Sequence, residues 1–514
     1  MTVNGPAKLS SENLSHLLST VGRPSYDRSA LSPGIVHIGV GNFHRAHQAT
    51  FLHRLFEQGK DRDWAIIGAG TRPFDRQMRD KLVAQDFLST IVELDPKGLT
   101  ATVIGSMIDF CKNEPQSVVD AISDPRIRVV SLTVTEGGYY VDASTGGFDT
   151  KHPEIVRDAS NLSSPSTVFG ILIEGLSRRR KMGVAPFTVM SCDNLPENGH
   201  VAHQTVVGLA RLADPDLADW IAANVAFPNS MVDCITPATG PRELALVRDR
   251  FGIIDEAAVV CEPFRQWVLE DKFPSGRPAF EDVGVQFVDD VAAYELMKLR
   301  ILNGGHAAIA YPAALLGYTY VDEAIADPDI SDWFGALQHR EIMPTVRLAP
   351  GIDPEKYFWT IVRRFANPEL GDTIPRLCMD GANRQPKFIL PIVDARLKTG
   401  GTVSGLALEI ALWCRYCAGE TDDGQTIQLD PGDAAALSAP AIAAKTDPMA
   451  WLSIHGIFGD LGDLEDFSEP FAYWLATLNS KGTRCALREY AQSGRDKAPA
   501  GPKRPDAMKA ARDE

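Results

Sequence analysis

Residues 34–48, GIVHIGVGNFHRAHQ, decide the fold of the N-terminal half of the chain. The run from Gly34 to Val40 predicts a buried strand that ends at Gly41, and the residues from Phe43 to Gln58 predict a helix. A glycine-rich turn between a strand and a helix lets backbone amides approach a bound pyrophosphate. A plain tight turn explains the same glycines equally well, because His44 stands where the third glycine of the G-x-G-x-x-G motif would lie.

The same alternation of strand and helix continues along the first half. Short β-branched runs alternate with stretches of helical length, which is typical of a parallel sheet covered by helices. Further strands are expected at Trp64–Gly68, Ile127–Val134 and Phe187–Met190, and helices at Asp75–Leu82 and Thr167–Met182. The pattern predicts an α/β fold with a Rossmann-like, doubly wound N-terminal domain.

From about Asp289 onward the segments lack β-branched runs and have helical length, as in VSGLALEIALWCRY and AYWLATLNS. We expect a strand at VGVQFV and place the domain boundary after it. The sequence thus predicts a Rossmann-like domain over residues 1–287 and a mainly α-helical domain over residues 288–492. Residues 493–514 are rich in proline, glycine and charge and are expected to form a mobile tail.

Composition narrows the function. The formal net charge of −16 over 514 residues argues against a nucleic acid or an anionic membrane as partner, so a small molecule is the expected substrate. No segment has the length and apolarity of a spanning helix, and the N-terminus has no secretion signal, so a cytoplasmic location is expected. Of the eight cysteines, the close pair Cys414 and Cys417 is expected to be two core thiols on one helix face.

The cofactor residues are expected at the ends of the predicted strands. Gly39, Gly41, Asn42 and Phe43 follow the first strand, Arg72 and Asp75 follow the second, and Thr133, Val134 and Thr135 follow the third. A carboxylate after the second strand binds the ribose diol of NAD, and Asp75 is the candidate. Two alternatives stay open: Asp75 caps the helix that it begins, or Arg72 and Arg76 favour NADP.

One helix carries the catalytic candidates. At about 100° per residue, Glu295, Lys298, Asn303 and His306 fall within an arc of about 140° on one helix. Polar groups on a mostly apolar helix are costly to bury without partners, which makes them functional candidates. An ordinary i,i+3 ion pair between Glu295 and Lys298 and a core role for His306 are the alternatives. No metal site is expected, because His44 and His47 lack further ligands at suitable spacing.

Six strings in this order resemble the polyol-specific long-chain dehydrogenases: GVGNFHRAHQ, TEGGY, MSCDNLPENG, FPNSMVDCITP, CEPFRQWVLEDKF and MKLRILNGGH. The resemblance runs from about Gly34 to at least Pro391. It implies a metal-independent NAD enzyme with a Rossmann-like domain, a largely helical C-terminal domain and an active site between them.

The resemblance also implies roles for single residues. Lys298 matches the general base, Asn194 and Asn303 the amides that hold the reacting oxygen, His306 the residue that orients the substrate, and Glu295 the carboxylate that gates proton exchange. Asp233, Arg376 and Arg384 match substrate contacts, although Arg384 stands where a lysine is expected.

The chemistry of alcohol oxidation agrees with those roles. Loss of hydride requires loss of the hydroxyl proton, and a free lysine, with a pKa of about 10.4, needs burial beside the cationic cofactor to act near neutral pH. The resemblance implies oxidation of D-mannitol to D-fructose, with D-arabinitol or a hexuronate, as in the fructuronate and tagaturonate reductases, as alternatives. A non-catalytic NAD-binding sensor is the rival of another class. The resemblance implies a monomer or a weak oligomer.

Overall fold

The computed structural model describes residues 5–142, 145–347 and 349–493. The chain divides into two compact units, Met1–Glu295 and Leu296–Glu514. Of the predicted tail, only Ser493 lies within the described residues, where it ends a helix. Among the described residues, no helix combines the length and the apolarity needed to cross a membrane.

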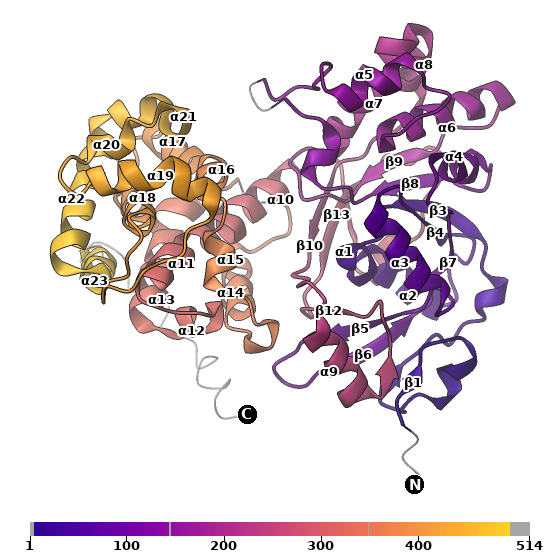
Figure 1. The fold of residues 1–514 in the computed structure, drawn as a ribbon, viewed down its shortest axis with the longest axis horizontal. Coiled ribbons are helices and arrows are strands. Elements are labelled where there is room, and N and C mark those ends of the chain that lie inside the picture. Colours follow the sequence, from indigo (N-terminus) through magenta and orange to yellow (C-terminus); the bar gives the residue numbers. More distant parts are fainter. Residues whose placement is uncertain (1–4, 143–144, 348, 494–514) are drawn as a thin grey trace. The chain divides into compact units, whose positions relative to one another are not determined.

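A parallel sheet of five strands forms the centre of the first unit (Figure 1). The strand order is β7-β4-β3-β8-β9, and every neighbouring pair is parallel. The strands are β3 (Pro33–Ile38), β4 (Ala65–Ala69), β7 (Met107–Phe110), β8 (Val129–Leu132) and β9 (Thr188–Ser191). The predicted doubly wound fold is confirmed, and all four predicted strands of this sheet are present.

The two faces of the sheet are covered by different helices. Ile35 belongs to the hydrophobic cluster that includes α1 (Asn42–Ala46), α2 (Gln48–Glu57) and Leu82 of α3 (Pro73–Val83). Val36 and Ile38 belong to the cluster on the other face, with α4 (Pro115–Ser123), α6 (Val168–Met182) and α7 (Asn198–Ala213). Successive side chains of a strand point to opposite faces, so β3 anchors both layers. Burying each such side chain contributes about 1.5–3 kcal/mol.

Three smaller sheets complete the first unit, and the sequence analysis anticipated only one of their strands. Two further helices, α5 (Pro153–Ser160) and α8 (Pro215–Asn224), pack on α7. The sheets are β12 (Val259–Cys261)-β5 (Ser89–Glu93)-β6 (Thr100–Ile104)-β2 (Val21–Gly22), β10 (Ser230–Asp233)-β13 (Gln266–Glu270)-β14 (Gln286–Val288), and β1 (Ala7–Lys8)-β11 (Ile253–Ile254). The anticipated strand is β14. Helix α9 (Pro241–Phe251) leads into β11.

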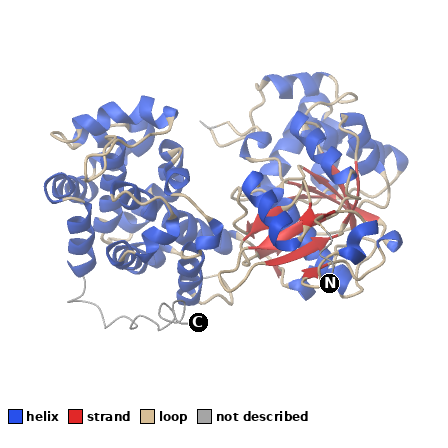
Figure 2. Ribbon diagram, turned by 60° about the horizontal axis from the view of Figure 1, so that its bottom comes forward, coloured by secondary structure: helices blue, strands red, loops and turns tan. Residues whose placement is uncertain are grey.

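The second unit is helical, as predicted: over residues 296–347 and 349–493 its named elements are all helices (Figure 2). Helix α18 (Ser404–Cys417) is buried and packs on α11 (Gly304–Leu315) and α22 (Glu465–Lys481). Cys414 and Cys417 are fully buried there as free thiols, so the expectation of core cysteines is confirmed.

Further α-helices are named for this unit. They are α12 (Val321–Ala326), α13 (Pro328–Leu337), α14 (Pro354–Phe365), α15 (Ile374–Cys378), α16 (Gly381–Phe388), α17 (Leu390–Lys398), α19 (Pro431–Ala443), α20 (Met449–Leu452), α21 (His455–Phe458) and α23 (Thr483–Ser493). Helix α10 (Ala292–Met297) spans the point at which the two units divide.

Candidate functional site

The turn between β3 and α1 requires its first glycine. Gly39 has φ +96°, and a Cβ added to it would lie 2.1 Å from the carbonyl oxygen of Thr133. Gly41 is the exposed N-cap of α1, and nothing but the Gly39 carbonyl comes within 4 Å of a Cβ built there. The first glycine therefore permits the close approach of two strand ends, and the second leaves the backbone open to a ligand. This geometry fits a dinucleotide pyrophosphate.

The residues that follow the turn have structural partners. The Asn42 amide donates to Thr239 Oγ1 at 3.0 Å and accepts from Arg45 at 2.8 Å. The Phe43 ring stacks on His47, with 4.8 Å between the ring centroids. Both residues stand at the start of α1, and their contact with the cofactor stays a prediction.

The histidines near the turn lie in the core. His44, which replaces the third glycine of the motif, stacks on His37 with 3.5 Å between ring centroids and 9° between the planes. His37 shares hydrogen bonds with Ser131 Oγ at 2.8 Å and Thr133 Oγ1 at 2.9 Å. Burial lowers the pKa of His37 to about 3. The His37 ring also contacts the Gly39 carbonyl, at 3.2 Å from its Nε2, so these buried rings pack against the turn.

Asp75 is the third residue of α3 and takes part in a capping box with the N-cap residue Arg72. Its carboxylate accepts the backbone N–H of Arg72 at 2.9 Å, and the residue is only 5% exposed. Burial raises its pKa, although the hydrogen bonds from the Arg72 and Thr71 backbone oppose this. The capping role that the sequence left open is therefore present, and binding of the ribose by Asp75 stays a prediction.

The segment after β8 is tied to the segment after β9. Thr133 Oγ1 donates to the Gly39 carbonyl at 2.6 Å, and the Val134 and Thr135 amides donate to the Asp193 carboxylate at 3.0 and 2.9 Å. Tyr139 also donates to this carboxylate, at 2.6 Å. Sequence reasoning missed Asp193, although its position inside the SCDN string was a signal. It holds two of the three predicted cofactor residues of this segment, Val134 and Thr135.

Asn194, Glu295 and Asp233 lie in the same unit. The Glu197 amide donates to the Glu295 carboxylate at 3.2 Å, three residues after the exposed Asn194. Asn198, which is fully buried, donates to the Asp193 and Ser230 carbonyls at 3.0 and 2.8 Å. It thereby joins the segment that carries Asn194 to β10, whose last residue is the buried Asp233. Asn198 is a second residue that the sequence analysis did not single out.

The predicted single α-helix around Lys298 is wrong in one respect. Residues Lys298–Asn303 form a π-helix between α10 and α11, so the assumed 100° per residue does not hold through them. The wider turn is held in place by Gln338, whose side chain donates to the Ile301 carbonyl at 3.0 Å. Lys298 is the first residue of this π-helix and is 8% exposed. Such π-helical turns occur frequently at functional sites.

The glycines after the π-helix serve packing. A Cβ on Gly305 would lie 3.1 Å from Gln338 Nε2 and 3.2 Å from the Phe334 ring. Gly304 and Gly305 are the first residues of α11 and are buried. A larger side chain at position 305 would therefore force Gln338 or Phe334 to shift.

His306 and two arginines share one neighbourhood in the second unit. The His306 ring stacks on Phe365, with 4.4 Å between the centroids, and its buried Nε2 has no partner among the described residues. Burial lowers its pKa to about 3, with smaller effects from Asp372, which opposes the change, and from Arg376 and Arg384. The ring is therefore neutral at physiological pH, with one donor and one acceptor nitrogen.

The two arginines differ in what they already bind. Exposed Arg376 forms a bidentate ion pair with Asp372, with N···O distances of 2.7 and 2.6 Å. Arg384 donates to the Leu377 carbonyl at 2.7 Å and is half-buried. Arg376 is therefore largely neutralised, whereas Arg384 retains further donors.

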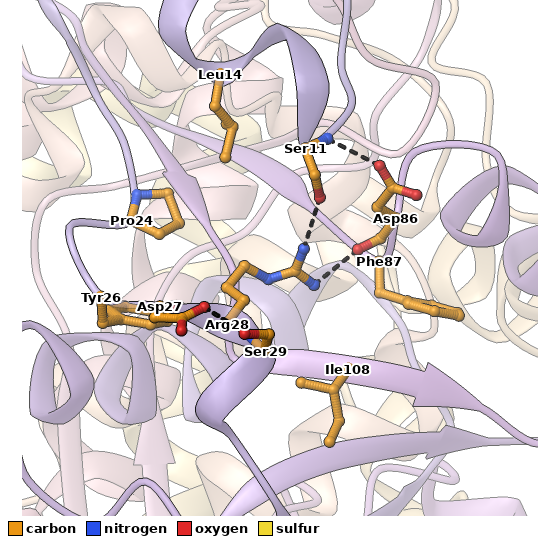
Figure 3. Close-up of a pocket in the computed structure, with 10 residues that line it drawn as sticks. All are labelled: Ser11, Leu14, Pro24, Tyr26, Asp27, Arg28, Ser29, Asp86, Phe87 and Ile108. Carbon is orange, nitrogen blue, oxygen red and sulfur yellow. Dashed lines mark hydrogen bonds between the residues drawn. The ribbon is translucent and has the colours of Figure 1, made fainter.

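A cavity of about 600 Å³ lies near the N-terminal segment of the first unit (Figure 3). Arg28 crosses it and donates to Ser11 Oγ and to the carbonyls of Gly105, Asp86 and Met107. Because the Arg28 guanidinium already donates to four acceptors, its role is structural: it holds the N-terminal segment against the strands.

Two family models match consecutive parts of the chain. Residues 33–282 match the mannitol dehydrogenase Rossmann domain, and residues 290–479 match the mannitol dehydrogenase C-terminal domain. Mannitol 2-dehydrogenase of Cereibacter sphaeroides is 53% identical over 92% of this chain and 99% of its own. The enzyme of the same name from Phaeosphaeria nodorum is 42% identical over 94% of this chain and 86% of its own.

Two solved structures match over nearly the whole chain. The Pseudomonas fluorescens mannitol 2-dehydrogenase, in a ternary complex with NAD and D-mannitol, has a TM-score of 0.83 and 40% identity over 95% of this chain and 100% of that one. A D-sorbitol dehydrogenase in substrate-free form has a TM-score of 0.87 and 35% identity over 93% and 100% of the two chains.

Proposed function

The chain belongs to the mannitol dehydrogenase family, and from this premise we propose that it is an NAD-dependent polyol dehydrogenase that interconverts D-mannitol and D-fructose. The observation that carries the proposal is its likeness, over 95% of the chain, to an enzyme solved with NAD and D-mannitol. The resemblance to polyol-specific dehydrogenases that the sequence motifs suggested is thereby confirmed.

The first unit provides the cofactor-binding residues. Gly39 and Gly41 would hold the pyrophosphate through open backbone amides, and the segment Thr133–Thr135 would lie along the dinucleotide. Bound NAD⁺ supplies the hydride acceptor. The tie between Thr135 and Asp193 supports this assignment, because a segment held by a buried carboxylate is set in place before the ligand binds.

Lys298 is the proposed general base. Its Nζ takes the proton of the substrate hydroxyl as hydride leaves the same carbon, and in ketose reduction it returns that proton. Its position on a buried π-helical turn supports the role, because such turns occur frequently at functional sites. Glu295 would pass the proton on to solvent.

The amides of Asn194 and Asn303 would donate hydrogen bonds to the substrate oxygen. Charge develops on this oxygen as the proton leaves, so preorganised donors stabilise the transition state more than the bound alcohol. His306, neutral and with an unpartnered Nε2 among the described residues, would bind a substrate hydroxyl. Asp233 and Arg384 would contact the remaining hydroxyls.

The state of Arg376 bears on the rival substrates. A hexuronate brings a carboxylate that needs a free cation, and Arg376 already binds Asp372 through two hydrogen bonds. Arg384, which retains further donors, is therefore the residue that a hexuronate carboxylate would meet. D-Sorbitol is a second candidate, because a D-sorbitol dehydrogenase matches the chain at a TM-score of 0.87.

The deciding experiment follows absorbance at 340 nm. The purified, chelator-treated protein is given NAD⁺ with D-mannitol, D-sorbitol, D-arabinitol and the hexuronate-derived alcohols in turn. NADH formation with D-mannitol well above the others is the expected result. Silence across the neutral polyols would direct the assignment to a uronate, and silence across all substrates with retained NAD binding would identify a sensor.

The cellular location and assembly state are further proposals. We expect a cytoplasmic protein that sediments as a monomer or a weak oligomer. Cell fractionation and sedimentation velocity test these two points.

A further inference from the structure

The turn after β4 lies beside the cofactor turn. Strands β3 and β4 are parallel neighbours, and the Gly39 amide donates to the Ala69 carbonyl at 3.0 Å. Residues Gly70, Thr71 and Arg72 therefore leave the sheet at the edge where Gly39 and Gly41 stand. In dinucleotide-binding folds the ribose 2′ position is recognised here, by a carboxylate for NAD or by an arginine for NADP.

The carboxylate that follows this strand end is already bound by its own turn. The residues directly after β4 are glycine, threonine and arginine, and the first acidic residue is Asp75. Its carboxylate is folded back onto the turn, so closely that a Cβ on Gly70 would lie 2.5 Å from Asp75 Oδ2. The carboxylate also accepts the Arg72 backbone N–H at 2.9 Å, so it is bound by its own turn. It is therefore not directed at the place of a 2′-phosphate.

Two arginines, Arg72 and Arg76, follow the end of β4. Arg72 is the N-cap of α3, and Arg76 follows one turn later, so the two lie on one face of the helix. Both side chains are exposed, and neither takes part in an ion pair among the described residues. The backbone N–H groups at the start of α3 add positive potential.

Arg72 also lies near Tyr140. Burial and the Glu154 carboxylate raise the pKa of Tyr140, and the Arg72 guanidinium opposes this change. Tyr140 belongs to the segment after β8, which also carries Thr133 to Thr135. The guanidinium is thus close to the segment proposed to line the dinucleotide.

We propose that this site accepts NADP(H) as well as NAD(H), and that Arg72 and Arg76 bind the 2′-phosphate. The inference rests on the proposed function, because it assigns the cofactor specificity of the same site. An exposed arginine pair matches the geometry of a phosphate group, which guanidinium binds through paired hydrogen bonds.

The test uses two ligands that differ only in the 2′-phosphate: adenosine 2′,5′-bisphosphate and adenosine 5′-monophosphate. Their binding to the full-length protein is measured by titration calorimetry without substrate. We expect the wild type to bind the bisphosphate more tightly. The double variant Arg72→Ser, Arg76→Ser should weaken bisphosphate binding by roughly 10- to 100-fold, the loss of one or two charge-assisted hydrogen bonds, and leave the monophosphate nearly unchanged.

The matched control is Arg250→Ser, which removes an exposed arginine at the far end of α9 and should change neither affinity. A wild type that prefers the monophosphate would overturn the inference, as would a double variant that loses both ligands equally. The readout is independent of turnover. If no polyol is oxidised but the bisphosphate is preferred, the function fails and the inference stands. If a polyol is oxidised but the bisphosphate is not preferred, the proposed function stands and the inference fails.

Discussion

The backbone amide of Thr135 donates a hydrogen bond of 2.9 Å to the carboxylate of Asp193. Thr135 has φ +65°, a conformation that costs a β-branched residue energy and needs outside support. Asp193 directly precedes Asn194, the proposed donor to the substrate oxygen. One buried carboxylate therefore fixes a segment proposed to contact the cofactor and a residue proposed to contact the substrate.

Asp193→Asn should raise the KM for NAD with a smaller effect on kcat at saturating NAD. Asparagine offers one acceptor oxygen to two amide donors, so one of them loses its partner. Leaving a buried donor unsatisfied costs about 1–3 kcal/mol, which a thermal melt should detect. Asp219→Asn, at an exposed ion pair with Arg211, is the control. A lower melting temperature with an unchanged KM would make Asp193 merely structural.

Lys298→Ala should reduce kcat by about 10²- to 10⁴-fold, the usual contribution of a general base. The affinity for NADH, measured by fluorescence titration, should stay nearly constant, because Lys298 acts on the substrate proton. Lys398→Ala removes an exposed lysine of α17 that pairs with Asp394 and should leave both quantities unchanged. Near-normal turnover of Lys298→Ala at neutral pH would remove this residue from the mechanism.

The doubly wound sheet could be predicted because its strands are buried on both faces. Buried parallel strands appear in the sequence as continuous apolar runs, such as IVHIGV before the turn at Gly41. The short strands β2, β10 and β12 were missed. They have two to four residues each, which is too few for a periodic signal, and their pairing depends on contacts far apart in the chain.

The site could be predicted only as a set of residue types. The motif around Lys298 could be recognised because polar groups interrupt an apolar helix. Nothing in MKLRILNGGH predicts a π-helix, however. That geometry depends on Gln338, which reaches the Ile301 carbonyl from a segment 37 positions later. Asp193 likewise acquires its role only when the ends of β8 and β9 come together.

Asp75→Asn should lower the free energy of unfolding by less than about 1 kcal/mol, because the asparagine oxygen can still accept the hydrogen bond from the Arg72 amide. It should leave the ratio of NAD to NADP affinity nearly unchanged, since the carboxylate is already bound to the Arg72 amide. Calorimetric titration with both cofactors measures the ratio. A shift of several-fold toward NADP would instead assign Asp75 to the ribose.

A buried carboxylate in α18 predicts a pH-dependent stability. Glu409 is fully buried, and its Oε1 accepts a hydrogen bond of 2.7 Å from Gln385. Burial raises its pKa to about 8 from the ordinary 4.5. Between these values the folded state holds a proton that the unfolded state has lost. The stabilising contribution is thus complete below about pH 4.5 and is lost as the pH rises toward 8, at about 1.4 kcal/mol per pH unit.

Glu409→Gln should remove this dependence, because glutamine has the same shape, can still accept from Gln385 and cannot ionise. The melting temperature of the variant should equal that of the wild type near pH 5 and exceed it by a growing margin up to pH 8. Glu469→Gln, at an exposed position of α22, is the control and should show no such trend. A constant difference between Glu409→Gln and the wild type at every pH would mean that Glu409 is ionised in the folded protein. In that case its charge must be balanced inside the second unit.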